Sequence, residues 1–278
     1  MRTIKVFFLA FLPFLMAFVP HSSPQHTPTQ APAGAGNETF SGGEELVYKI
    51  FYKINFIWVP AGEITFKVFD EGKQFHYQAL GRTYSSYEWF YVVRDEYNSW
   101  VDKATFLPNY SERSVSEGKY TIFEKISFNN TARKHTVWRA KKRGQPETQT
   151  EHDVKSATHD VLSSLYFLRT LEFSDKSSGY SIPFSVFMDK EEFPLKMRFL
   201  GKEDRKKVHN MGRYRTLKFQ PDVIAGNVFS EESKMTVWVS DDANKIPVLI
   251  ESPISVGSVQ VVLKSYKGLK FDFGAKVD

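Results

Sequence analysis

The apolar and polar residues of this chain alternate along many short segments. In residues 63–69, Ile64, Phe66 and Val68 fall on one face, while Glu63, Thr65 and Lys67 fall on the other. Successive side chains of a β-strand point to opposite faces of its sheet, so this alternation predicts a strand with one buried face. Residues 70–73 have the composition of a hairpin turn, and residues 74–83 form the returning strand. The pattern therefore predicts an antiparallel meander.

Similar segments continue to the end of the chain and are separated by turn residues such as Gly118-Lys119 and Asn129-Asn130. Breaks are expected at residues 58–62 and 201–204, a short helix or bulged turn at 84–90, and a polar loop at 141–150. The remaining predicted strands are residues 46–54, 91–97, 99–101, 108–117, 120–129, 131–139, 180–189, 193–202, 205–209, 211–220, 235–240, 247–251 and 258–273.

One segment, residues 160–173, has helical spacing instead. Its apolar residues recur mainly at intervals of three, which places them in one stripe along a helix. Asp160 can accept hydrogen bonds from the free amides at the start of this helix. The stripe consists of Val161, Leu162, Leu165, Leu168 and Leu171, widened by Tyr166 and Phe167.

Roughly a dozen antiparallel strands do not make a flat sheet, because the twist between neighbouring strands accumulates. We therefore expect a mainly β, single-domain protein. Its antiparallel sheet should curl into an open or half β-barrel with a spiral-like shape. One central α-helix, at about residues 160–173, should pack on the sheet or fill its hollow.

The N-terminal residues have the pattern of a secretory signal peptide. Arg2 and Lys5 precede an apolar run at residues 6–19, and a polar tract follows. This run is shorter than the roughly 20 residues of a membrane-spanning helix, although an uncleaved anchor remains the alternative. We expect a signal peptide at residues 1–20, a flexible leader at 21–43 and the β domain at 44–278. Because the chain has no cysteine, it can carry no disulfide and no lipid-modified cysteine. The expected location is the periplasm.

The charge of the chain is only mildly basic. Its formal net charge is +5, and Arg2 and Lys5 of the predicted signal peptide supply two of these charges. Such a surface does not indicate nucleic-acid binding. Basic residues cluster only at Lys141-Lys142-Arg143 and Arg205-Lys206-Lys207, which are typical of solvated turns; attraction to an anionic membrane surface is the alternative. We expect no nucleic-acid partner and no stable membrane span in the mature chain.

The sequence contains none of the common catalytic or nucleotide-binding motifs, GxSxG, GxxxxGK, GxGxxG and HExxH. A possible metal pattern, His152-Asp153-Val154 echoed at His159-Asp160-Val161, is explained as well by a loop followed by a helix start. For hydrolysis, the one local cluster joins Ser163 or Ser164 with His159 and Asp160. We therefore expect no catalytic residues, no metal and no cofactor.

Aromatic residues make up 15% of the chain, with 25 Phe, 13 Tyr and 5 Trp. They favour strands, and they gather in residues 84–100. This cluster either packs in the core and rim of the sheet or lines an apolar cavity that binds an apolar ligand. The candidate ligand-binding residues are Tyr84, Tyr87, Trp89, Phe90, Tyr91, Arg94 and Trp100, with Asp160 and Arg169 adding polar groups from the helix.

Five ordered motifs carry a family resemblance that covers residues 43–265. They are Gly43-Glu44-Glu45-Leu46-Val47-Tyr48, Pro60-Ala61-Gly62, Phe90-Tyr91-Val92-Val93-Arg94-Asp95, Asp160-Val161-Leu162-Ser163-Ser164-Leu165-Tyr166-Phe167-Leu168-Arg169, and Lys245-Ile246-Pro247-Val248 followed by Val256-Gly257-Ser258-Val259. With them the chain resembles the domain of unknown function 3108 family of exported bacterial proteins. The resemblance implies an antiparallel fold and an envelope location in a Gram-negative bacterium, but no activity and no catalytic residue.

The expected architecture also resembles the outer-membrane lipoprotein carriers, which hold acyl chains in a half-barrel. Likeness of fold alone does not establish function. The leading hypothesis is an exported, non-enzymatic protein that binds an apolar or amphipathic component of the cell envelope, or a segment of an envelope protein, in the hollow of its sheet. The first alternative is an envelope scaffold or protein-interaction module without a small ligand. The second alternative is a hydrolase with a non-local site.

Overall fold

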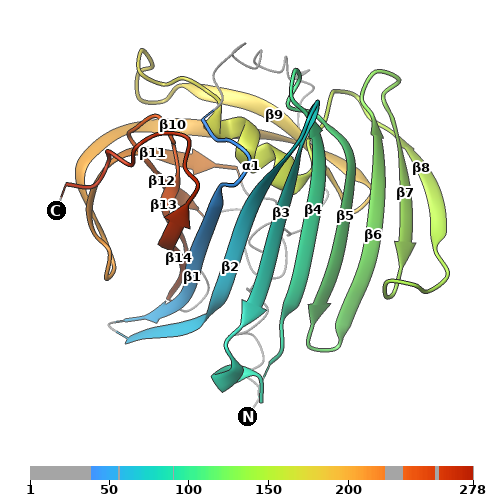
Figure 1. Ribbon diagram of the computed structural model, residues 1–278, viewed down its shortest axis with the longest axis horizontal. Helices are drawn as coiled ribbons and strands as arrows, with labels where there is room; N and C mark the ends of the chain where they lie inside the picture. Colours follow the sequence, from blue (N-terminus) through green and yellow to red (C-terminus); the bar gives the residue numbers. More distant parts are fainter. Residues whose placement is uncertain (1–38, 56, 90, 223–233, 254–256, 278) are drawn as a thin grey trace.

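The computed structural model describes residues 39–55, 57–89, 91–222, 234–253 and 257–277. Among these residues, fourteen strands form one antiparallel sheet that curls around a single α-helix (Figure 1). The strand order is β8-β7-β6-β5-β4-β3-β2-β1-β14-β13-β12-β11-β10-β9, so that β8 and β9 are the two ends of the sheet. The predicted fold class is confirmed.

The elements have the following bounds: β1 Glu45–Ile54, β2 Ile57–Glu71, β3 Gln74–Thr83, η1 Ser85–Tyr87, β4 Arg94–Asp102, β5 Pro108–Glu117, β6 Tyr120–Asn129, β7 Lys134–Ala140, β8 Thr148–Asp153, α1 Val161–Arg169, β9 Ser181–Met188, β10 Glu191–Val208, β11 Gly212–Pro221, β12 Thr236–Ser240, β13 Pro247–Pro253 and β14 Ser258–Lys267.

The alternation of apolar and polar side chains in β2 and β3 decides which face of the sheet is buried. Val68 pairs with Tyr77, and both side chains are almost completely inaccessible on the hollow face of the sheet. Gly72 has a φ of 73° in the connecting turn, a backbone conformation that glycine adopts without steric cost. The same inward face continues into β1 with Tyr48 and Ile50. A one-residue slip of any of these strands would move the whole apolar row to the solvent side.

The curl of the sheet places α1 between two parts of it. Strands β3 and β4 contact α1 on one side, and β9 contacts it on the other. Figure 1 shows β9 and β10 passing behind the helix while β2 to β6 lie in front of it. The core therefore lies inside the curled sheet, around α1.

Two predicted breaks are wrong. Residues 58–62 belong to β2, where the register shifts between Ile50 and Phe51 of β1, opposite Pro60; such a bulge accommodates a proline that cannot donate to the ladder. Residues 201–204 belong to β10, which continues from Glu191 to Val208. Its register shifts between Phe199 and Gly201 and again between Glu203 and Lys206, so the turn-like residues there bend the strand without ending it.

Three boundaries also differ from the prediction. The helix ends at Arg169 because the Thr170 amide bonds to the Phe167 carbonyl and Lys245 takes the Leu171 carbonyl at 2.8 Å. Part of the expected polar loop forms β8, whose side chains are mostly exposed and lack an alternating apolar pattern. Strand β14 ends at Lys267, short of the expected residue 273.

The folded core extends into residues that the sequence assigns to the leader. Phe40 is completely buried, and its ring lies 5.0 Å from the ring of Tyr166 and 5.4 Å from that of Phe75. The predicted signal peptide and residues 21–38 of the leader lie outside the described residues. No helix among the described residues has the length and apolar character needed to cross a membrane.

Replacing Phe40 by Ala tests whether this segment belongs to the folded unit. Truncating a fully buried phenylalanine costs about 3–5 kcal/mol of unfolding free energy, because it removes apolar contact and leaves a cavity. The matched control is Phe69→Ala, since Phe69 is 41% exposed on the outer face of β2. Chemical denaturation should show a large loss for Phe40→Ala and a small one for Phe69→Ala. Equal, small losses would place Phe40 outside the cooperative core.

Candidate functional site

The hollow of the sheet is filled largely by aromatic side chains. Tyr77 of β3 stacks on Tyr166 of α1 with ring centroids 4.0 Å apart, and Phe40 meets both rings edge to face. Phe75 and Phe167 are also fully buried in this cluster. Because these residues come from β3, from α1 and from the segment before β1, the helix is held by elements far apart in the sequence.

A buried ion pair crosses the aromatic interior. Arg169 donates two hydrogen bonds to Glu44, at 2.6 and 2.8 Å, and a third to the carbonyl of Asn244 at 3.0 Å. Its guanidinium also lies over the rings of Phe40 and Tyr166. Burial alone would lower the pKa of Arg169, but the attraction of Glu44 outweighs this and raises the pKa above its ordinary value, so the guanidinium stays charged. Removing one partner would leave the other charge buried, which typically costs several kcal/mol.

Asp160 acts as the N-cap of α1. Its carboxylate accepts from the amides of Leu162 and Ser163, at 2.8 and 3.0 Å, and from the hydroxyl of Ser99 on β4 at 2.5 Å. Burial raises the pKa of Asp160, and the hydrogen bonds from Ser99 and Ser163 oppose this rise. Ser163 completes a capping box, since its hydroxyl accepts from the Asp160 amide. The cap therefore ties the start of the helix to the sheet.

His159 is packed rather than open to a substrate. It is completely buried, its ring lies 4.6 Å from that of Phe167, and burial lowers its pKa to about 3, so it is neutral. Its amide donates to Ser185 of β9, and its carbonyl accepts from Phe187. No group of three or more His, Asp or Glu side chains in the described part of the chain is placed to hold a metal ion.

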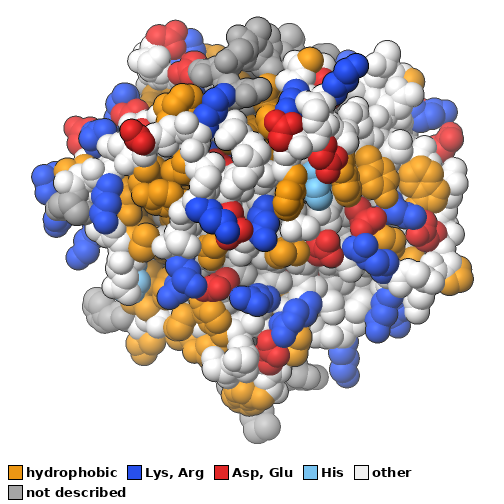
Figure 2. Space-filling view, viewed as in Figure 1, with side chains coloured by type: hydrophobic (Ala, Val, Ile, Leu, Met, Phe, Trp, Pro, Cys, Tyr) orange, Lys and Arg blue, Asp and Glu red, His pale blue; other side chains and the backbone are white. Residues whose placement is uncertain are grey.

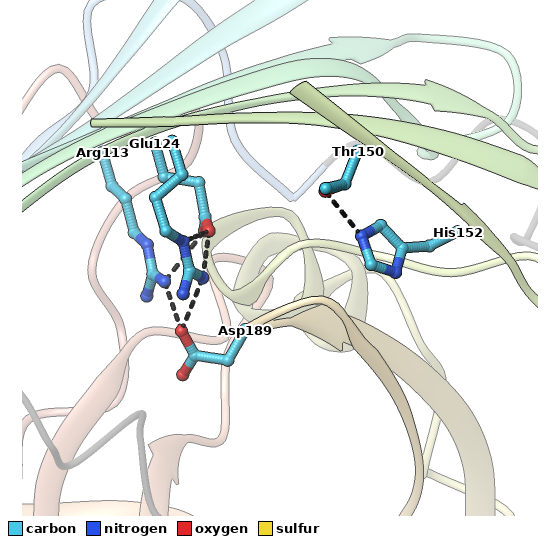
Figure 3. A network of polar contacts seen from close by, with 6 residues as sticks. Arg113, Glu124, Thr150, His152 and Asp189 are labelled. Carbon is cyan, nitrogen blue, oxygen red and sulfur yellow. Dashed lines mark hydrogen bonds and ion pairs between the residues drawn. The ribbon is translucent and has the colours of Figure 1, made fainter. Parts of the chain in front are cut away.

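The two ends of the sheet meet through side chains. Arg113 of β5 reaches Glu124 of β6 at 2.8 Å and Asp189 of the β9–β10 turn at 2.6 Å. Arg139 of β7 also pairs with Glu124 and lies 3.0 Å from Asp189. Figure 3 shows Arg113, Glu124 and Asp189 pointing toward one another below the strands. The charges of the two arginines are thus balanced by the two carboxylates at this junction.

A second set of contacts continues the junction. Ser156, in the segment between β8 and α1, donates to Ser185 of β9 at 2.8 Å and also contacts Glu192 of β10. His152 of β8 approaches the ring of Phe187 at 5.9 Å. No main-chain ladder joins β8 to β9 in the described part of the chain. We call this junction the seam; it consists of Arg113, Glu124, Arg139, His152, Ser156, Ser185, Phe187, Asp189 and Glu192.

A small cavity lies between the seam and the start of α1. Its volume is about 30 Å³, and its lining includes Asn98, Ser111, Arg113, Glu124 and Asp160. A water molecule needs about 10–15 Å³ of such space, so the cavity has room for about two waters. An acyl chain would need the interior to open.

The structure does not bring the sequence candidates together at one site. Tyr84, Tyr87 and Tyr91 are half-buried and Trp89 is 83% exposed, all in the connection between β3 and β4; Phe90 lies outside the described residues. Arg94 is exposed and pairs with Glu88.

The other candidates lie on opposite faces of the sheet. Trp100 stacks on His76 of β3 on the outer face, with ring centroids 4.4 Å apart. Asp160 and Arg169 lie in the interior, where they cap the helix and form the ion pair. Of the described aromatic residues in 84–100, only Tyr97 is buried on the inward face, where it lines the small cavity; the others lie along a rim and an outer face.

Several interior residues were missed by the sequence prediction. Tyr77 belongs to a strand that the alternation identified, so its inward position could have been read from its parity with Phe75 and Ala79. Tyr166 was placed in the helical stripe but not considered as a site residue. The seam residues carry no local signal, because Arg113, Glu124, Arg139 and Asp189 come from four separate segments.

Comparison with known proteins finds a matching family model and solved structures. A family model described as "Protein of unknown function (DUF3108)" matches residues 47–264. A solved β-barrel-like protein of domain of unknown function DUF1849 from Brucella abortus is similar over 82% of this chain and 98% of its own, with 8% identity and a TM-score of 0.53. A solved protein from Bacteroides fragilis, described as exported and YmcC-like, covers 82% and 97% with 8% identity and a TM-score of 0.27. No curated protein matches the chain.

Replacing Asp189 by Asn tests the electrostatic part of the seam. Burial would raise the pKa of Asp189, but Arg113 and Arg139 more than offset this, so its pKa is lowered. A carboxyl with a lowered folded-state pKa stabilises the fold above its unfolded value and loses this contribution as the pH falls. Asp189→Asn should therefore cost about 1–2 kcal/mol at neutral pH, where a charged partner is lost.

The difference between the two proteins should shrink as the pH falls below the ordinary aspartate value of about 4. Denaturation curves for wild type and Asp189→Asn at neutral and acid pH measure it. Asparagine also tolerates the positive φ of 48° at this position, so backbone strain does not confound the comparison. A loss that is independent of pH would show that the ion pairs do not hold the seam.

Proposed function

The chain belongs to the DUF3108 family of proteins of unknown function, and from that premise we propose that it is an exported, non-enzymatic protein that holds an apolar or amphipathic molecule of the cell envelope. In this proposal the molecule lies inside the curled sheet, against α1, and enters where the two ends of the sheet meet. The N-terminal pattern of residues 1–20 supports export to the periplasm.

The observation that carries this proposal is a set of polar atoms without partners inside the aromatic core. The hydroxyls of Tyr77 and Tyr166 are buried and have no hydrogen-bond partner among the described residues. The Nε of Arg169 is also buried and has no hydrogen-bond partner among the described residues; the guanidinium lies over the Tyr166 ring. A buried polar group without a partner destabilises a fold, and in a native structure it usually marks a functional site or a bound group. These atoms could bind the polar end of an amphipathic ligand.

The seam supports a route into this interior. A closed β-barrel opens only when a main-chain ladder is broken, whereas the ends of this sheet meet mainly through side chains and the two main-chain bonds of His159. Movement of the β9–β10 hairpin away from β5 and β7 would uncover the aromatic cluster around α1. The lining of that cluster is apolar, so a ligand that replaced its contacts would be apolar along most of its length.

Exchanging both tyrosines for phenylalanine separates ligand binding from folding. Tyr77→Phe/Tyr166→Phe removes hydroxyls that have no protein partner, so the stability of the empty protein should stay equal or rise. Binding of a fluorescent fatty acid should weaken about tenfold or more, since each hydrogen bond to a ligand contributes about 1 kcal/mol. Tyr110→Phe on the outer face is the matched control. Titration of the probe and native mass spectrometry of freshly purified protein measure the two effects.

The proposal fails if purified protein carries no lipid and the wild type does not bind the acyl probe. It also fails if the double variant binds the probe as tightly as the wild type while the Tyr110→Phe control is unchanged.

A second candidate function rests on the edge of the sheet. Strand β8 has a partner on one side only in the described residues, and its side chains are polar and largely exposed. An edge of this kind can accept an extended segment of another protein as an added strand. Under this scaffold function, crosslinking in intact cells should yield one stable partner attached near β8, and the acyl probe should not bind.

A further inference from the structure

The most exposed large apolar side chains of the described residues gather at one end of the sheet. They are Trp89, Ile57 and Tyr120, which are 83%, 65% and 54% exposed. No other large apolar side chain in the described part exceeds 42%. Single exposed apolar residues are normal on a protein surface, but they are expected to scatter over it. Here the three side chains with the largest exposed fractions occur together at one end of the sheet.

The topology of the sheet explains why they share that end. In an antiparallel meander, the connections β1–β2, β3–β4, β5–β6 and β7–β8 all lie at the same ends of the strands. Ile57 lies at the first, Trp89 at the second and Tyr120 at the third. We call the end formed by residues 55, 57–58, 84–89, 91–93, 118–120 and 141–147 the lower rim, because it faces downward in Figure 1. Hydrophobic side chains protrude at this end in Figure 2.

The lower rim also carries exposed lysines. The fourth connection contains Lys141 and Lys142, and the third contains Lys119; all three are exposed and form no ion pair among the described residues. The ring of His209, next to the basic cluster Arg205-Lys206-Lys207, stacks on Trp58 with centroids 4.0 Å apart. Both basic clusters of the sequence therefore lie at or beside this rim.

The opposite ends of the strands differ in their apolar side chains. Their connections carry Lys73, Lys103, Arg133 and Lys155, and the adjoining strand ends carry Asp70, Glu71, Asp102, Lys134 and Asp153. Exposed basic side chains therefore occur at both ends, whereas the three most exposed large apolar side chains occur only at the lower rim.

We propose that the lower rim docks on the surface of a lipid bilayer that contains anionic lipids. Trp and Tyr side chains prefer the level of the lipid headgroups, where an apolar ring and a polar tip are both accommodated. Unpaired lysines are attracted to anionic headgroups. Three separate apolar side chains on three connections, with lysines on the third and fourth connections, are compatible with a fluid lipid surface. A protein partner would instead require a continuous, shape-complementary apolar patch.

Docking of this kind stands independently of the proposed ligand in the interior. If both hold, the protein would meet its apolar ligand at a membrane surface, with the hollow of the sheet close to the bilayer.

Sedimentation with vesicles tests the docking directly. Wild-type protein should bind vesicles of phosphatidylcholine and phosphatidylglycerol in equal parts, bind pure phosphatidylcholine vesicles far more weakly, and lose binding as salt is added. Ile57→Ser/Trp89→Ser/Tyr120→Ser should weaken binding at least about tenfold, because it removes the groups that insert. Lys141→Glu/Lys142→Glu should weaken binding to the anionic vesicles by a similar factor.

Matched variants at other places on the surface provide the controls. Phe69→Ser/Tyr180→Ser/Phe271→Ser removes three apolar side chains that are 41–42% exposed away from the lower rim. Lys73→Glu/Lys155→Glu makes the same charge change at the opposite ends of the strands. Both controls should bind vesicles as the wild type does, and circular dichroism should show that all variants are folded. The proposal is overturned if the wild type does not bind anionic vesicles, or if the control variants lose as much binding as the rim variants.

Discussion

The structure of this protein depends on one constraint: its sheet curls almost into a barrel, and no ladder between described residues closes it. Fourteen antiparallel strands carry enough accumulated twist to bring β8 near β9. The final approach is then made by side chains, chiefly the two arginines that share Glu124 and Asp189. The segment that leads from β8 into α1 adds two main-chain bonds to β9. The interior is thereby enclosed, but along one line its closure depends on weaker and more separable contacts than those of a ladder.

The same constraint explains why charge is buried in the core. A helix inside a hollow sheet needs specific contacts to fix its position, because apolar packing alone permits several similar arrangements. The bidentate pair of Arg169 with Glu44 anchors the end of α1, and the cap formed by Asp160 with Ser99 anchors its start. Buried ion pairs add little net stability, so their contribution here is the placement of the helix. The hydroxyls without described partners belong to Tyr166 of that helix and to Tyr77, which stacks on it, and this is why we propose the ligand there.

The sequence predicted the sheet well because strand parity is a local property. The inward row of β2 and the fold class follow from spacing, and the start of the helix follows from the capping residue Asp160. The breaks at Pro60 and Gly201 were predicted wrongly, since a shift in the pairing register with the neighbouring strand decides whether such residues end a strand or only bend it. The candidate site was harder to predict for the same reason. The aromatic residues near position 90 are prominent in the sequence, but the partners of Tyr77, Arg113 and Asp189 come from distant segments and are visible only in the folded chain.

Residue-resolved hydrogen exchange tests most directly whether the seam opens. The amides of His159 and Phe187 form the two main-chain bonds between the segment before α1 and β9, each at 2.8 Å. If the seam opens without global unfolding, both amides should exchange with a markedly lower free energy than the amide of Tyr77 in β3. A disulfide joining Ser156→Cys to Ser185→Cys, whose hydroxyls lie 2.8 Å apart in a chain without cysteine, should abolish that difference when oxidised and restore it when reduced. Equal exchange free energies for all three amides in the wild type would contradict the account.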